Sequence, residues 1–399
     1  MTWWTAVKRD NGVAITAVAA LSCLGNTPEQ HQSMIDRGRH GLRPLGELAG
    51  SPEEFSWVPS GCIEPRGFLV GSRYGPGANL AVEVSRRPIE GAELGADELN
   101  DAWLMVGSSR GNAAGWVDPW PGRRRHRLMS TSNSMHSEVA AAVSIEYGIR
   151  GPYHVISNGC ASGLDAIGLA YLAVSAGIAP RAMVVSLDLP LVPTLLRSYA
   201  ETGLLSRDGT NDPYSPSTTG FLPAEGAAAL LLEPSGAERS PLGYIHGYWA
   251  NSDAFHPLGI PADGRGIADC VRQGIDAVGR HGVVAVCPHA SGTHAHGQAE
   301  RRALATVFPD DGGRISLHLL KPFTGHTVGA SGAIDVAILM HYQKQGLLPP
   351  NLPGLTGAGG AFSLPTVPTD AAGRVVLKVS VGLGGRNAVV ALSRERRLP

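Results

Sequence analysis

The sequence predicts an α/β protein with a duplicated core, and three observations support this prediction. Short aliphatic runs alternate with longer helical patterns rich in small residues, which is typical of sheets covered by helices. A strand, a polar loop and an apolar helix occur twice in the same order. The apolar helix of each copy contains a single formal charge near its start, which indicates burial on all sides. We therefore expect one large layered unit built from two related halves.

The elements follow from the periodicity and from the turn residues between them. The expected strands are Val13–Ala19, Ala102–Val106, His154–Ser157, Met183–Leu187, Ala227–Glu233, Val283–Cys287, Ile315–Leu320, Val375–Val381 and Ala388–Ser393. The expected helices include Ser137–Tyr147, Ala161–Ala176, Gly264–His281, Gln298–Val307 and Gly329–Gln345. Gly25 to Glu29 predicts a turn and a helix N-cap. Two segments rich in Pro, Gly, Ser or charge, Pro119–Arg127 and Leu205–Thr219, are expected as surface excursions.

Composition excludes several classes of protein. The 399 residues are 43% hydrophobic, and 33 Lys and Arg face 34 Asp and Glu, so no strong field attracts nucleic acid or an anionic membrane. The one dense basic run, Arg123 to Arg127, predicts a solvated loop or a docking site for an acidic partner. No apolar run reaches the length of a membrane span. The apolar stretch from Val13 to Leu24 predicts a first buried strand, with an export signal as the alternative.

Cysteine usage indicates a reducing compartment. The five cysteines are odd in number, widely scattered and without a CxxC pair, which argues against a disulfide framework and against a zinc site. We therefore expect reduced thiols, a cytoplasmic protein and no bound metal.

The internal repeat places chemistry-bearing residues at equivalent positions. The strand that begins at His154 leads through Cys160 into Ala161-Ser162-Gly163, and the strand that begins at Ile315 leads through Lys321–Thr327 into Ala330-Ser331-Gly332. Asp165 is the only formal charge of the first helix, and Asp335 is alone from Gly329 to Met340. Pseudo-symmetry would bring the loops that precede the two helices together at one site.

Cys160 is the candidate nucleophile because it stands between a strand and a buried helix. The free N–H groups and the dipole of a helix N-terminus favour a thiolate, so we expect a lowered thiol pKa. Gly159 and Gly163 permit a tight turn around it. The alternative is a buried structural cysteine, which we expect for the other four.

Two histidines are the best candidate partners of that thiol. His326 occupies the place in the second unit that Cys160 holds in the first, and His289 follows the strand Val283–Cys287 and opens a small-residue loop. His294 and His296 are expected to be structural or exposed. The glycine-rich turn Gly382–Asn387 could be a simple hairpin or could offer a backbone N–H to an oxyanion.

These residues give the sequence a resemblance that covers nearly the whole chain. It resembles a β-ketoacyl synthase, a condensing enzyme of the thiolase-like superfamily. The matching segments, in the family's order, are Val13 to Asn26 with the opening strand and turn, Asn158–Gly163 with the nucleophile motif, Gly220–Gly226 with GFVxGEG, Ser252–His256 with SDAxH, Pro288–Thr293 with AHGTGT, Lys321–Gly332 with KxxTGHTxGAAG, and Gly382–Asn387 with GFGGTN. The resemblance implies a five-layered αβαβα fold whose halves, residues 1–245 and 246–399, form one integrated unit that is usually dimeric.

The resemblance also implies a mechanism. Cys160 would take an acyl group from a carrier-protein or coenzyme A thioester, with the backbone N–H groups of Cys160 and Leu383 as the oxyanion hole. His289 and His326 would stabilise the enolate formed when a malonyl thioester loses CO2, and that carbanion would attack the acyl-enzyme. Further residues would play supporting parts: Lys321 paired with Asp335, Ser291 and Thr293 against the phosphopantetheine arm, and Phe221 and Leu383 in the acyl pocket. The carrier's arm would be a substrate carrier, and no other cofactor is expected.

Departures from the family pattern leave some assignments open. Ala290 and Ser291 replace a glycine and a threonine, so a shifted alignment would put Ser291 in the histidine slot; the gapless alignment, which keeps the spacing to Glu300, favours His289. Leu383 replaces the usual gating phenylalanine and Arg386 a threonine, which suggests a different acyl-pocket gate. Residues 213–219 lack the two acids and the arginine of PFDxxRD, and Gly159 replaces an alanine.

Three functions therefore fit the sequence. The first is a cysteine-dependent condensing enzyme of fatty-acid or polyketide type, working with an acyl carrier protein as a homodimer or as a heterodimer with a homologue. The second is a non-elongating relative that transfers or cyclises an acyl chain without decarboxylation. The third, a non-catalytic subunit like a chain-length factor, is disfavoured because Cys160 is present.

Overall fold

The computed structural model describes residues 12–398 except 49, 72, 114, 116–129, 310–314, 357–361 and 372. Its helices are α1 (Pro28–Asp36), α2 (Pro76–Gly91), α3 (Ala96–Asn100), α5 (Ser130–Asn133), α6 (Glu138–Tyr147), α7 (Ser162–Ser175), α8 (Pro193–Glu201), α9 (Arg265–Val278), α10 (His294–Val307), α11 (Lys321–Thr324) and α12 (Ser331–Lys344). Its main-sheet strands are β1 (Val13–Leu21), β4 (Trp103–Gly107), β5 (Tyr153–Ile156), β6 (Ala182–Asp188), β7 (Gly226–Pro234), β8 (Gly243–Ser252), β9 (Val283–Cys287), β10 (Ser316–Leu317), β13 (Val375–Gly382) and β14 (Arg386–Ser393). Four short strands, β2 (Arg43–Pro44), β3 (Pro59–Ser60), β11 (Leu347–Leu348) and β12 (Thr369–Asp370), form two small ribbons.

The main sheet consists of two matching five-stranded halves. Its strand order is β10-β9-β13-β14-β8-β1-β7-β6-β4-β5. Counted outward from the central strand, β1 in one half and β8 in the other, each half places its first, fifth, fourth, second and third strands of the chain side by side. The two halves therefore have the same topology. Only Val13–Ile15 of β1 pairs with Gly243–Ile245 of β8, and the halves diverge beyond that short antiparallel contact. The predicted division at residues 245 and 246 falls inside β8.

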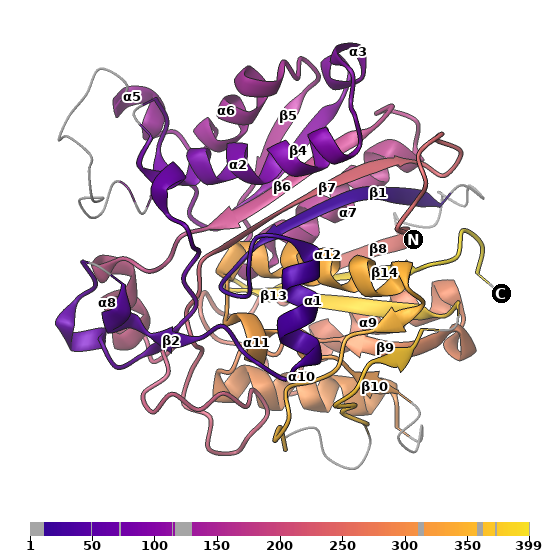
Figure 1. Ribbon diagram of the computed structural model, residues 1–399. Coiled ribbons are helices and arrows are strands. Elements are labelled where there is room, and N and C mark those ends of the chain that lie inside the picture. The colour runs from indigo at the N-terminus through magenta and orange to yellow at the C-terminus, as the bar shows by residue number, and fades with distance from the viewer. Residues whose placement is uncertain are drawn as a thin grey trace.

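Helices cover both faces of each half and complete five layers. α2 and α6 lie on the outside of the first half, α9 and α10 on the outside of the second, and α7 and α12 lie between the halves (Figure 1). The start of α7 packs closely on the turn that precedes α12. A side chain at Gly163 would not fit there, since a Cβ built on it would lie 2.7 Å from Gly329 O. The α/β fold class and the duplicated core predicted from the sequence are confirmed.

Most predicted elements are present, and the misses have local causes. The predicted strand Ile315–Leu320 is shorter, since α11 begins at Lys321, and the predicted helix Gln298–Val307 begins earlier, at His294. Two elements were not among those expected: β8, whose Gly, His and aromatic residues make no aliphatic run, and α2, which contains Pro88. The predicted N-cap is confirmed, since the Thr27 side chain accepts a hydrogen bond from Gln30 N.

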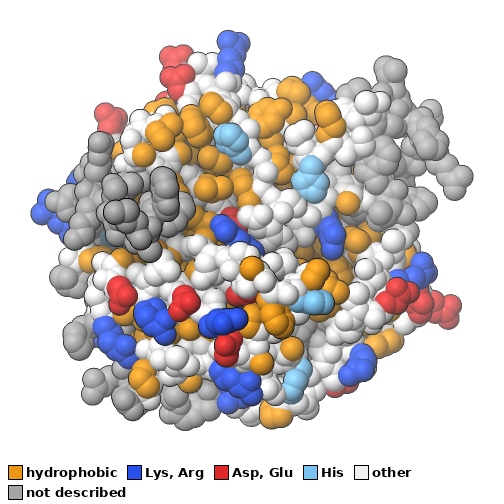
Figure 2. Space-filling model, turned by 180° about the vertical axis from the view of Figure 1, so that it is seen from behind, with side chains coloured by type: hydrophobic (Ala, Val, Ile, Leu, Met, Phe, Trp, Pro, Cys, Tyr) orange, Lys and Arg blue, Asp and Glu red, His pale blue; other side chains and the backbone are white. Residues whose placement is uncertain are grey.

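The surface agrees with the near-neutral composition. On the face seen in Figure 2, basic and acidic side chains lie interspersed. The predicted excursion Pro119–Arg127, with its basic run, lies outside the described residues. The other, Leu205–Thr219, consists of turns, and Ser206, Tyr214 and Thr218 within it are buried. Within the described part of the chain, no helix is long and apolar enough to cross a membrane.

Candidate active site

Cys160 lies where the sequence placed it, at the turn between β5 and α7. It is partly buried in a single 3-10 turn, Gly159–Ala161, directly before α7. Gly159 has a φ of 58°, a left-handed conformation that favours glycine. Ser162 fixes the turn, because its hydroxyl donates to Gly159 O at 2.6 Å and accepts from Asn158 N at 2.9 Å.

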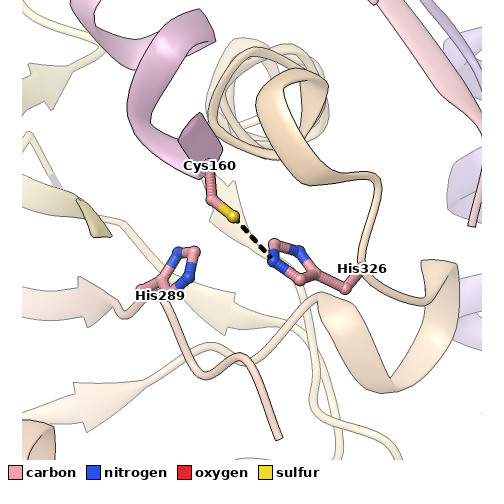
Figure 3. A group of neighbouring side chains, drawn as sticks. All are labelled: Cys160, His289 and His326. Atoms are coloured by element: carbon pink, nitrogen blue, oxygen red, sulfur yellow. Dashed lines mark hydrogen bonds between the residues drawn. The ribbon is translucent and has the colours of Figure 1, made fainter. Parts of the chain in front are cut away.

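His326 is the direct partner of the Cys160 thiol. Its Nε2 lies 3.2 Å from Cys160 Sγ, as Figure 3 shows, and its Nδ1 lies 3.0 Å from Ser331 Oγ. The Ser331 hydroxyl donates its one proton to Val328 O at 2.7 Å, so Nδ1 of the imidazole is the donor to Ser331 Oγ. This tautomer leaves a lone pair on Nε2 that faces the thiol and can accept its proton.

His289 approaches the same thiol from the loop after β9 (Figure 3). The possible ligand atoms of Cys160, His289 and His326 all lie within 4.8 Å of one another, and the rings of His289 and His326 pack edge to face with centroids 5.2 Å apart. Ser291 instead pairs with Thr293, Oγ to Oγ1 at 3.1 Å. The geometry therefore favours the gapless alignment.

Glu300, buried on α10, anchors the His289 loop. Its carboxylate accepts hydrogen bonds from His289 N at 2.7 Å and from Ala290 N at 2.8 Å. Burial acts to raise the pKa of Glu300, but His296 and these two N–H donors lower it to about 2. The two hydrogen bonds from the loop backbone to Glu300 also hold Ala290 at a φ of 43°. Glycine adopts this left-handed conformation most easily, which accounts for the glycine of the family pattern at that position.

Burial keeps the three central groups neutral. It raises the pKa of the Cys160 thiol to about 12, against an opposing effect of Lys321, and lowers the pKa of His326 and of His289 well below the usual value. The sequence-based expectation of a lowered thiol pKa is therefore wrong for the resting site: desolvation outweighs the favourable helix end. The site rests as a thiol beside a neutral imidazole.

The predicted pair of Lys321 and Asp335 exists, but Lys378 is the closer partner of Asp335. The Asp335 carboxylate lies 3.7 Å from Lys321 Nζ and 2.5 Å from Lys378 Nζ. Lys321 also donates to His289 O, so it links the acid to the histidine loop. Lys378 was not among the predicted site residues, although a lone lysine inside a predicted buried strand is a usable signal of a buried ion pair.

The turn Gly382–Asn387 lies beside the nucleophile. A Cβ built on Gly159 would lie 3.1 Å from Leu383 N, and one on Gly382 only 2.3 Å from Asn158 O. The backbone of Leu383 therefore lies against Gly159, the residue before Cys160. Arg386, at the end of the same turn, pairs with Asp165 of α7 at 2.9 Å.

A cavity of about 560 Å³ surrounds the thiol. The predicted site residues that line it are Cys160, Phe221, His289, Ser291, Thr293, His326 and Leu383. The Phe221 ring packs edge to face on His326, with centroids 5.2 Å apart. His296, expected to be structural or exposed, also lines the cavity and packs on His289 at 4.9 Å. Ser331 is a further site residue that the sequence did not single out.

Comparisons with known proteins match most of the chain. A family model described as "Beta-ketoacyl synthase, N-terminal domain" matches residues 10–237, and its C-terminal counterpart matches residues 242–354. The actinorhodin polyketide putative beta-ketoacyl synthase 1 of Streptomyces coelicolor is 26% identical over 95% of this chain and 88% of its own. The chloroplastic 3-oxoacyl-[acyl-carrier-protein] synthase I of Arabidopsis thaliana is 25% identical over 96% and 86%.

Solved structures share the fold. A chain of the AntDE:AntF complex, a type II PKS acyl-carrier protein with its ketosynthase bound to the hexaketide, matches with a TM-score of 0.84 and 21% identity over 97% of this chain and 100% of that one. The ishigamide ketosynthase/chain length factor matches with a TM-score of 0.84 and 20% identity over 96% and 99%.

Proposed function

Since the chain belongs to the β-ketoacyl synthase family, we propose that it forms carbon–carbon bonds by decarboxylative Claisen condensation in fatty-acid or polyketide-type biosynthesis. The observation that carries the proposal is the cluster of Cys160 Sγ, His326 and His289, whose ligand atoms lie within 4.8 Å of one another. A structural cysteine has no need of two neutral imidazoles in a cavity.

Loading begins from the neutral thiol. As Cys160 Sγ attacks the carbonyl of an acyl thioester, its proton passes to His326 Nε2, which lies 3.2 Å away. The N–H groups of Cys160 and Leu383 are the proposed donors to the oxyanion. The carrier thiol leaves with the proton, and the acyl group remains on Sγ.

Condensation follows on the same residues. A malonyl thioester places its carbonyl oxygen between His289 and His326, whose N–H groups stabilise the enolate as CO2 departs. The carbanion attacks the acyl-Cys160 carbonyl, the bond to Sγ breaks, and the β-ketoacyl chain leaves on the carrier. The Cys160 thiolate released in this step takes up a proton from water, which restores the resting thiol. Lys321, which donates to His289 O, positions that histidine from behind.

An acyl carrier protein is the proposed donor, as in the complex named for one structural relative. Ser291 and Thr293 line the cavity and are the proposed contacts of its phosphopantetheine arm, with no other cofactor needed. The five free cysteines fit a cytoplasmic location.

Dimerisation is proposed through β5. This strand ends the main sheet, and Tyr153 on it is 43% exposed while Ile145 on the neighbouring α6 is 57% exposed. A strand at the edge of a sheet, with exposed apolar side chains beside it, can pair with a strand of a second chain. Another structural relative is named as a ketosynthase/chain length factor, so the partner is this chain or a homologue. Light scattering at micromolar concentration should give twice the chain mass alone or with that homologue, and a monomer in both cases would contradict it.

The central test separates loading from decarboxylation. Intact mass would follow acylation by acyl carrier-protein thioesters, and CO2 release would be measured with malonyl thioesters. Cys160→Ala should abolish stable loading. His289→Ala should load nearly normally yet release CO2 about 10²–10³-fold more slowly, since one lost donor to the enolate costs about 2.7–4 kcal/mol.

Ser291→Ala is the matched control, because it changes the adjacent loop without removing an imidazole. It should keep the decarboxylation rate and weaken carrier binding. If Ser291→Ala stops decarboxylation and His289→Ala does not, the assignment of His289 is wrong. A wild-type enzyme that loads but never releases CO2 would indicate the non-elongating alternative.

A further inference from the structure

Arg110 is a charged residue in the cavity that the mechanism does not use. It follows β4 and lines the cavity together with Cys160. Its Nε is buried and has no hydrogen-bond partner among the described residues. An arginine is charged at any physiological pH, so it places a fixed cation in this cavity.

Asp188, the buried acid that binds the backbone N–H of Arg110, forms no ion pair with its guanidinium. Asp188, at the end of β6, already accepts from Ser108 Oγ at 3.1 Å, from Ser109 N and Arg110 N at 2.9 Å each, and from Gly329 N at 2.7 Å. Its oxygens are therefore occupied by the backbone and by a hydroxyl. Within the part of the chain that the structure describes, Arg110 forms no ion pair.

Tyr199 of α8 adds a second unused donor next to Arg110. Its hydroxyl is buried and also lacks a hydrogen-bond partner among the described residues. Burial raises the pKa of Tyr199 to about 12 while Arg110 acts to lower it, which places the guanidinium near the hydroxyl. A half-buried guanidinium whose Nε has no hydrogen-bond partner, next to a buried hydroxyl with which it interacts, favours an anionic ligand between them.

A row of aromatic rings connects this pair to the nucleophile. The Tyr199 ring packs on Phe221 at 5.1 Å, and Phe221 packs on His326 at 5.2 Å, next to the Cys160 thiol. An acyl chain on Cys160 that runs along Phe221 would bring its far end to Tyr199 and Arg110. An all-hydrocarbon chain would leave the guanidinium desolvated and unpaired there, at a cost that disfavours binding.

We propose that Arg110 and Tyr199 bind a carboxylate at the far end of the acyl group carried by Cys160, so that the substrate class is ω-carboxyacyl thioesters. The guanidinium would take the carboxylate in a two-pronged hydrogen-bonded ion pair, and the Tyr199 hydroxyl would donate to it. This inference rests on the proposed function, because it requires that Cys160 be acylated.

Competing acylation with three pantetheine thioesters tests the inference. The probes are adipyl, monomethyl adipyl and hexanoyl, which differ in the end group and little in length, and intact mass would follow the rate on Cys160. The wild-type enzyme should load adipyl at least about tenfold faster than the monomethyl ester, the gain expected of a desolvated charged hydrogen bond of about 1.5–3 kcal/mol. Equal rates, or a preference for the ester or for hexanoyl, would overturn the inference.

Variants locate the effect. Arg110→Met should lose the preference for adipyl while hexanoyl loading persists, and Arg110→Lys should keep part of it. Tyr199→Phe should reduce the preference less than Arg110→Met. Arg207→Met is the matched control, since Arg207 is an exposed arginine at the same cavity, and the preference should persist.

Loss of the preference in Arg207→Met, or its survival in Arg110→Met, would overturn the assignment. If Arg110→Met instead slows CO2 release from malonyl thioesters and leaves acyl selectivity unchanged, Arg110 serves the extender substrate and the inference is wrong. Should Arg110→Met fail to fold, the wild-type contrast between adipyl and its ester decides alone. Failure of all three probes to load would instead contradict the proposed function.

Discussion

The starts of α7 and α12 are built alike but use their serines differently. In each, the serine at the start of the helix donates to the carbonyl three residues earlier: Ser162 to Gly159 O and Ser331 to Val328 O. Ser162 then accepts from the backbone N–H of Asn158, whereas Ser331 accepts from the ring of His326. The same local structure fixes a nucleophile in one half and orients a proton acceptor in the other.

The buried acids of the two helices differ in how far their basic partners are exposed to solvent. Asp165 of α7 pairs with Arg386, whose side chain is 32% exposed, while Asp335 of α12 pairs with Lys378 and Lys321, which are 0% and 5% exposed. If the acid of the first pair is lost, water can solvate the charge left on Arg386. The charges of Lys378 and Lys321 would stay buried without that compensation. The first half therefore carries the proposed nucleophile, and the second holds the buried charges and the two histidines that would serve it.

The largest expected difference between the halves concerns stability. Asp335→Asn removes the one carboxylate that two buried lysines share, so the free energy of unfolding should fall by about 3–5 kcal/mol. Asp165→Asn should cost clearly less, because the Arg386 guanidinium can reach water. Urea unfolding monitored by circular dichroism would measure both changes.

Equal losses in the two variants would contradict the contrast in burial. If Asp335→Asn is too unstable to purify, the double change Asp335→Leu with Lys378→Met removes the closest pair together. It should recover only part of the lost stability, because Lys378 is no longer left unpaired but the buried Lys321 still loses its acid.

The second comparison is between the thiol and the imidazole that face each other across the halves. Burial raises the pKa of Cys160 to about 12 and lowers that of His326, so the pair rests neutral rather than as thiolate and imidazolium. Only the thiolate reacts with iodoacetamide. As long as the pH is below the pKa, the thiolate fraction increases tenfold for each unit by which the pH rises. Alkylation of Cys160 should therefore accelerate about tenfold per pH unit from pH 7 to pH 9.

Intact mass against pH, with Cys160→Ala as the background, would measure this dependence. A rate that levels off near pH 7 would show an ion pair at rest and would restore the lowered thiol pKa expected from the sequence. The other four cysteines do not line the cavity and should react more slowly throughout.

Local pattern predicted the repeat and the catalytic cluster, because each depended on residues adjacent in the sequence. The buried strands, the helix start after Cys160 and the motif around His326 are of this kind. Long-range packing determined what was missed. Lys378 meets Asp335 only when β13 lies against α12, and the thiol pKa depends on how completely the two halves exclude water. Arg110 follows an ordinary strand, and nothing local indicates that it borders the cavity.

The smallest and most specific contrast is between the two serines. The Ser331 hydroxyl can accept from Nδ1 of His326, as it does at rest, or turn from Val328 O and donate to it, so it supports both tautomers. The first tautomer accepts the Cys160 proton during loading, and the second presents an N–H to the malonyl carbonyl. Ser331→Ala loses the hydrogen bond to the imidazole in whichever tautomer is present, and that bond is worth about 1 kcal/mol in each.

Loading and CO2 release should each slow about fivefold in Ser331→Ala, as expected for about 1 kcal/mol. Ser162→Ala instead removes two hydrogen bonds between its hydroxyl and the backbone, so it should lower the free energy of unfolding by about 1–3 kcal/mol. Single-turnover kinetics together with urea unfolding of both variants would separate the two effects. If Ser331→Ala slows neither step, His326 is oriented by its packing on Phe221 and His289 alone. If Ser162→Ala slows both steps as much, the two helix starts serve the chemistry alike and the contrast between them fails.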